Sequence, residues 1–188
     1  MSAATHVAPF AIVYADIEAA RKRIMGHAVV TPLLSSPDLD AHTGGRIFVK
    51  AEPLQRTGSF KFRGAYNRIS QLTPDEQKRG VVAYSSGNHA QGVAYAAQSF
   101  GMKATIIMPK DSPELKISNT RGYGAEVILY DRYGEDREAI GARISAETGA
   151  ILVPPYDDPN IMAGQGTIGI EIVEQLEELG LSADIVLC

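Results

Sequence analysis

The sequence contains no tryptophan, and its only cysteine is Cys188. A single cysteine excludes an internal disulfide and any metal site built from several cysteines, which fits a reducing compartment. An excess of basic residues is also missing, since 18 Lys and Arg stand against 22 Asp and Glu and the net charge is −4. The one dense basic run, Arg21 to Arg23, lies among acidic and apolar residues, so we expect a solvated helix face and no nucleic-acid partner.

Long hydrophobic runs are absent as well. The N-terminal segment has no basic start, and its apolar stretch is soon interrupted by Asp16, which argues against a signal peptide and a membrane span. Hydrophobic residues make up 45% of the chain and charged residues 21%, as is typical of globular proteins. The sequence therefore predicts a soluble, cytoplasmic protein without a membrane partner.

From about residue 45 onward, short β-branched or apolar runs alternate with longer helix-like segments. The expected strands are 46–50, 81–84, 104–108, 126–130, 150–153 and 184–188, and the expected helices are 59–72, 88–100, 113–122, 134–148 and 160–179. This alternation indicates βαβ units, and therefore an α/β fold with mostly parallel sheets and helices on both faces. Ligands of such folds bind at the carboxyl ends of the strands.

The order of the elements predicts two lobes. We expect residues 74–158 to form a small α/β domain, with residues 1–73 and 159–188 contributing to a larger one. The last residues, 184–188, have the pattern of an apolar strand with no turn or polar tail after it. Because an unpaired apolar strand edge invites aggregation, we expect the chain to be a fragment of a longer protein.

Lys61 lies in a segment with unusual helix chemistry. Thr57, Gly58 and Ser59 offer a cap and a flexible turn, so Lys61 would occupy the first turn of a helix. A cation is disfavoured there by up to about 1 kcal/mol, because the helix dipole is positive at that end. This position indicates a role other than helix stability, although a solvated surface lysine is the commoner explanation.

A second polar segment lies between the expected strand 81–84 and the expected helix 88–100. It consists of Ser85, Ser86, Gly87, Asn88 and His89. Backbone N–H groups at a helix N-terminus are free to bind an anion such as a carboxylate. Taken alone, these residues favour plain N-capping over ligand binding.

Together, TGSFKFRGA around Lys61 and SSGNHAQGVAYAA at 85–97 resemble the fold-type II pyridoxal-phosphate (PLP) enzymes, in the branch of threonine dehydratase and serine racemase. The segment VPPYDDPNIMAGQGTIGIEI at 153–172 is similar to that of threonine dehydratases. The resemblance covers roughly residues 27–188 and implies a two-lobed, tryptophan synthase β-like α/β fold. It also implies that the C-terminal part of the large domain is missing, from the phosphate-binding glycine loop onward.

The resemblance implies that Lys61 binds PLP covalently and serves as a catalytic base, while Phe60 packs against the ring and Asn88 binds its hydroxyl. The loop from Ser85 to His89 would bind the carboxylate of a small amino acid. The implied reaction is the dehydration and deamination of L-threonine or L-serine to 2-oxobutanoate or pyruvate, with release of ammonia. No metal site is expected, and the parent protein would be a homodimer or homotetramer.

Ser86 leaves the reaction open. Many threonine dehydratases have alanine there, whereas serine racemases use a serine as a second acid or base, so a racemase and a 3-hydroxyaspartate dehydratase remain alternatives. Cysteine synthase-type chemistry is disfavoured, because that group usually has Thr-rich substrate loops. Ser35, Ser36 and Thr57 match nucleotide-binding positions of the racemase branch, although Arg56 replaces the lysine expected beside them.

Two further features limit the prediction. Gly164, Gly166 and Gly169 spell GxGxxG with Asp184 downstream, but no strand directly precedes them, so we expect helix packing and not dinucleotide binding. The resemblance implies that, without the phosphate loop, the cofactor would lose more than about 5 kcal/mol of binding free energy. We therefore expect the chain alone to bind PLP weakly, and an inactive fragment or non-catalytic subunit remains an alternative.

Overall fold

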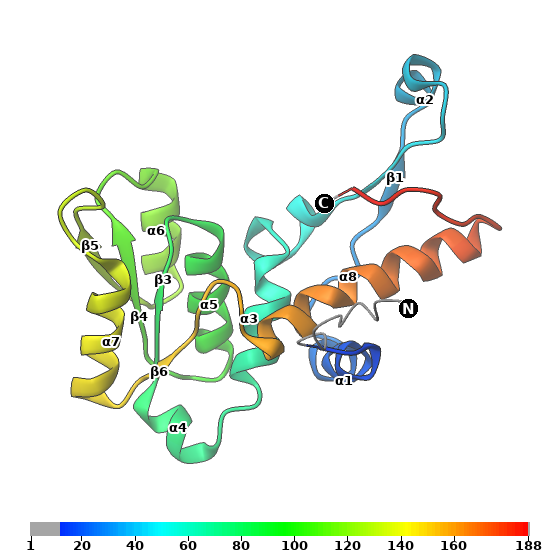
Figure 1. Cartoon of the computed structure of the whole chain (residues 1–188). Coiled ribbons are helices and arrows are strands. Elements are labelled where there is room, and N and C mark those ends of the chain that lie inside the picture. Colours follow the sequence, from blue (N-terminus) through cyan, green and yellow to red (C-terminus); the bar gives the residue numbers. More distant parts are fainter. Residues whose placement is uncertain (1–11, 188) are drawn as a thin grey trace, which may run out of the picture.

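The computed structural model describes residues 12–187, which form eight α-helices and two sheets (Figure 1). The helices are α1 Tyr14–Ile24, α2 Pro37–Thr43, α3 Lys61–Ile69, α4 Pro74–Arg79, α5 Asn88–Ser99, α6 Glu114–Gly122, α7 Arg137–Thr148 and α8 Pro159–Glu178. The strands are β1 Leu33–Ser35, β2 Phe48–Lys50, β3 Val81–Tyr84, β4 Ala104–Pro109, β5 Glu126–Tyr130 and β6 Ile151–Leu152, and short 3₁₀ turns span Glu52–Leu54 and Arg56–Gly58.

The larger sheet has four parallel strands in the order β5-β4-β3-β6. Its central strands are buried on both faces: Ala83 and Ile106 belong to the hydrophobic cluster under α5, whereas Val82 and Ile107 belong to the cluster under α7. Figure 1 shows α7 on one side of this sheet and α5 and α6 on the other. Burial on both faces explains why these strands read as continuous apolar runs without polar alternation.

The second layer of the molecule is helical, with α3 packed between α5 and α8 and with α1 against α8 (Figure 1). A Cβ at Gly164 of α8 would lie 2.6 Å from the carbonyl oxygen of Arg63, so α3 and α8 approach more closely than any side chain allows. A Cβ at Gly166 would lie 3.0 Å from Ile17, whereas Gly169 faces open space. Helix packing by the GxGxxG glycines is therefore confirmed for two of the three positions.

Five expected strands and five expected helices are confirmed within a few residues at their ends. One expected strand is wrong, because residues 184–187 are exposed and form no strand; Cys188 lies outside the described residues. A strand needs a neighbour that accepts its backbone hydrogen bonds, and none is present for this segment among residues 12–187. The expectation of mostly parallel sheets is confirmed, and the exception is β2, which pairs antiparallel with the unpredicted β1.

The remaining expectations concern the basic run, a membrane span, a signal peptide and the domain boundaries. The basic run Arg21 to Arg23 is exposed, as expected of a solvated helix face, and Arg21 also donates to Glu174 of α8 at 2.7 Å. No helix within residues 12–187 is long and apolar enough to cross a membrane. The N-terminal segment that argued against a signal peptide falls mostly on residues 1–11, outside the described part, and the domain boundaries at 73 and 158 stay predictions.

Candidate functional site

Lys61 is the first residue of α3 and is half-buried. Its Nζ donates to the backbone carbonyl of Pro155 at 2.9 Å and lies 5.1 Å from the centre of the Phe60 ring. Within residues 12–187 the amine forms no salt bridge, and burial lowers its pKa below the usual lysine value. A larger fraction of the amine is therefore neutral, and a neutral amine is both a nucleophile and a base.

The loop Ser85 to Asn88 follows β3 and leads into α5 with Gly87 as the N-cap. Among residues 12–187 no side chain caps this helix; the Ser85 hydroxyl instead accepts from the Gly87 N–H at 3.2 Å within the loop. The first backbone N–H groups of α5 therefore have no intrahelical or capping acceptor. An uncapped N-terminus of a twelve-residue helix favours the binding of an anion here over plain N-capping.

His89, in the first turn of α5, has a buried side chain that contacts the segment after β6. Its side chain is 2% exposed, and its Nε2 lies 3.1 Å from the carbonyl oxygen of Val153. Burial lowers the pKa of His89 to about 4, so the ring is neutral at pH 7, with the proton on Nε2 and a bare Nδ1. That Nδ1 is buried without a hydrogen-bond partner among residues 12–187 and cannot donate to a carboxylate. Only the His89 backbone N–H remains for that task.

Two packing features bring Lys61 and the loop together. The segment that follows β6 binds both, because Pro155 accepts from Lys61 and Val153 from His89. At Gly92 of α5, an added Cβ would lie 3.1 Å from the backbone carbon of Lys61, so α5 rests directly on the start of α3. Sequence reasoning missed Gly92, although a glycine within a helical pattern is a signal of close packing.

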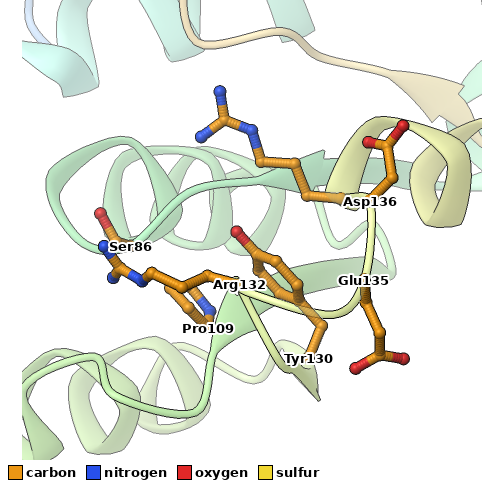
Figure 2. A pocket seen from close by; sticks show the side chains of 7 residues that line it. Ser86, Pro109, Tyr130, Arg132, Glu135 and Asp136 are labelled. Carbon is orange, nitrogen blue, oxygen red and sulfur yellow. The ribbon is translucent and has the colours of Figure 1, made fainter.

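A pocket of about 330 Å³ opens beside the loop, at the carboxyl ends of β4 and β5. It is lined by Ser86, Pro109, Tyr130, Arg132, Glu135, Asp136 and Arg137. Figure 2 shows the Arg132 side chain extending toward Ser86, while the Glu135 carboxylate points away from it. The Asp136 carboxylate accepts from the backbone of α7 as its N-cap, so the groups left to contact a ligand are mainly donors.

The three nucleotide candidates differ in their surroundings. Ser35 ends β1 and is exposed, and the Ser36 hydroxyl caps α2 by accepting from the Leu39 N–H at 3.4 Å. Thr57 has a left-handed backbone with a φ of 63°, and its hydroxyl is buried without a partner among residues 12–187. Nucleotide binding stays a prediction. Within the same described range, no group of three or more His, Cys, Asp or Glu side chains is arranged to hold a metal ion.

Comparisons with known proteins match this geometry. A family model described as "Pyridoxal-phosphate dependent enzyme" matches residues 24–188. The chain is 52% identical to an L-threo-3-hydroxyaspartate ammonia-lyase of Pseudomonas sp, over 86% of this chain and 50% of that protein. It is 51% identical to the L-threonine ammonia-lyase of Thermotoga maritima, over 87% of this chain and 41% of that protein.

A solved structure agrees with these relatives. Maize serine racemase superposes with a TM-score of 0.87 at 40% identity, covering 90% of this chain and 51% of that one. The chain thus spans about half the length of the relatives it matches. On the match over residues 24–188 and this shared architecture, the chain belongs to the pyridoxal-phosphate dependent enzyme family and has the α/β fold of its fold-type II members.

Proposed function

We propose that Lys61 holds pyridoxal phosphate and that the chain provides the substrate-binding side of an enzyme that deaminates threonine or serine by dehydration. The observation that carries this proposal is the Lys61 amine, half-buried against Phe60, free of carboxylates in the described residues and with a lowered pKa. The uncapped helix N-terminus close to it fits the carboxylate of an amino-acid substrate.

In this proposal each residue has a physical task. Once the substrate amine has replaced it on the cofactor, the freed neutral amine of Lys61 would accept the α-proton of the substrate, and the N-terminus of α5 would bind the substrate carboxylate. Phe60 packs against the cofactor ring, Asn88 donates to its hydroxyl oxygen, and Ser86 presents a hydroxyl to the substrate. When bound, the cofactor supplies an electron-accepting ring that spreads the charge left by the departing proton. Loss of the β-hydroxyl as water, followed by hydrolysis of the released imine by one water, would then give ammonia and 2-oxobutanoate or pyruvate.

Replacing Lys61 with alanine tests the proposal directly. We expect the wild-type chain, saturated with PLP and treated with borohydride, to carry a pyridoxyl group on the peptide that contains Lys61, and Lys61→Ala to lose both this adduct and the cofactor's absorbance band. Mass spectrometry of the digested chain locates the group. Lys78→Ala is the matched control, since the Lys78 side chain is 77% exposed and should leave the adduct unchanged. Labelling mainly at another lysine would contradict the assignment.

The pocket beside Ser86 supports a second candidate, the deamination of 3-hydroxyaspartate. This substrate carries a second carboxylate, and the pocket offers two guanidinium groups, from Arg132 and Arg137. Arg132 already donates to Asp111 at 2.8 Å, whereas Arg137 has two longer contacts, with the Tyr156 hydroxyl at 3.3 Å and with the Glu138 carboxylate at 3.9 Å. Arg137 is therefore the better placed of the two to bind a carboxylate, through paired charge-assisted hydrogen bonds.

Substitution of Arg137 with methionine discriminates between the two candidates. If the chain binds 3-hydroxyaspartate, Arg137→Met is expected to weaken that binding at least about tenfold and to change threonine binding little. Calorimetry with both amino acids on the PLP-loaded chain measures this, with Arg143→Met on the exposed face of α7 as the control. Equal losses for both amino acids would argue against a subsite for the second carboxylate.

The remaining expectations extend the proposal. The hydroxyl of Ser86 is compatible with serine racemase activity, and formation of D-serine from L-serine would reveal that activity. If the chain is instead a non-catalytic fragment, it would bind amino acids without turnover. A homodimer or homotetramer, a cytoplasmic location and a nucleotide site near Ser35, Ser36 and Thr57 are also proposals. Their support is the family resemblance.

A further inference from the structure

Asn88 is held from outside the loop by a lysine that the sequence analysis did not single out. Lys116 lies in the first turn of α6, and its Nζ donates to Asn88 Oδ1 at 2.7 Å across 28 residues of chain. The stem of Lys116 also passes the loop, because a Cβ added at Gly87 would lie 3.9 Å from its Cγ and Cδ. Lys116 is half-buried and forms no salt bridge with a carboxylate of residues 12–187.

This contact decides which way the Asn88 amide faces. A lysine ammonium carries only donors, so the amide oxygen must be the atom turned toward Lys116. The two N–H groups of Asn88 are then presented on the opposite side of the amide, away from α6. Without Lys116, both amide orientations would be open to an exposed asparagine.

A neighbouring contact between the same two helices makes it possible to distinguish an effect on the Asn88 amide from an effect on helix packing. One turn further along both helices, Asn119 Nδ2 of α6 donates to Gln91 Oε1 of α5 at 3.0 Å. Two side-chain hydrogen bonds of similar length therefore connect α6 to α5. Only the first of them ends on the candidate site, so the second provides a natural control.

We propose that Lys116 is a positioning residue, which turns the N–H groups of Asn88 toward the cofactor's ring oxygen and places a positive charge behind them. The inference rests on the proposed function, in which Asn88 donates to that oxygen. A fixed donor and a nearby cation both stabilise the ionised oxygen over its protonated form. Lys116 therefore lowers the pH at which the bound cofactor changes its absorbance.

The test compares three variants of the chain in the presence of PLP. Lys116→Met keeps the stem but removes the donor and the charge; we expect about tenfold weaker PLP binding and an upward shift of the pH midpoint of the cofactor's absorbance. Lys116→Arg retains donors and charge and should restore most of both properties. Asn119→Ala breaks the neighbouring contact and should leave the pH midpoint at the wild-type value.

NMR spectroscopy without cofactor tests the contact between Lys116 and Asn88 itself. We expect the side-chain amide resonances of Asn88 in the NMR spectrum to move in Lys116→Met and to stay in place in Asn119→Ala. Unchanged Asn88 resonances, or an absorbance midpoint that moves equally in Lys116→Met and Asn119→Ala, would overturn the inference. Failure of the wild-type chain to form a reducible adduct at Lys61 would instead remove the proposed function, and the inference with it.

Discussion

Replacing Arg63 with methionine is expected to lower the free energy of unfolding by about 3 to 5 kcal/mol, because it leaves two buried carboxylates without their shared cation. The Arg63 side chain is 0% exposed and donates to Glu52 at 2.8 and 2.9 Å and to Glu171 at 2.6 and 2.9 Å. Lys50 pairs with Glu171 at 2.6 Å and completes a cluster of two cations and two anions. The charges balance only while Arg63 is present.

The cluster joins segments that are far apart in the sequence. Glu52 belongs to the turn after β2, Arg63 to α3 and Glu171 to α8. Burial opposes the charged form of Glu171, but the hydrogen bonds from Arg63 and Lys50 outweigh it and keep the pKa of this carboxyl below its usual value. Because Arg63 is two residues from Lys61, the same cluster holds the start of α3 in place.

Urea denaturation followed by circular dichroism measures the effect of Arg63→Met. The matched control is Arg21→Met, which removes a bidentate pair between α1 and α8 whose side chains are 47% and 43% exposed. Such a surface pair contributes about 1 kcal/mol or less. A loss in Arg63→Met no larger than that in Arg21→Met would show that the buried cluster is not a main source of stability.

Acidification from pH 6.5 to pH 4 is expected to remove about 3 kcal/mol of stability through His89 alone. Its pKa is lowered from 6.5 to about 4 by burial in the folded chain, whereas the unfolded chain keeps the ordinary value. Between these two values the unfolded state binds more protons, so stability falls as the pH drops and the loss is complete below about pH 4. Above pH 6.5 the His89 contribution is fully present.

His89→Gln isolates this contribution, because glutamine retains an N–H donor for the Val153 carbonyl and does not titrate. We expect the variant to be less stable than wild type at pH 7.5 but to lose clearly less stability on acidification. His42→Gln, at an exposed position of α2, is the control and should follow the wild-type acid profile. Parallel profiles for His89→Gln and wild type, measured by urea denaturation at each pH, would exclude His89 as the acid-sensitive group.

Much of the candidate site was predictable because it lies in continuous segments. Lys61 opens a helix and Asn88 begins the next predicted one, as the local pattern indicated. The neutral state of His89 was not predictable, since it depends on the Val153 carbonyl and on burial. Arg137 lines the pocket beside the loop and Lys116 donates to Asn88, both from other helices, and no short-range pattern connects them to the loop.

The sequence by itself determined the elements of the larger sheet, because a strand such as 81–84 is apolar on both faces and because helix-like segments of crossover length separate the strands. It also determined the family, through motifs that each lie within about 20 residues. The tertiary structure alone decided the buried Arg63 cluster, the close contact of Gly92 with Lys61, the orientation of the Asn88 amide and the absence of a strand at 184–187. Those features depend on which distant groups meet, and on whether a partner strand is present to accept hydrogen bonds, which a local pattern does not specify.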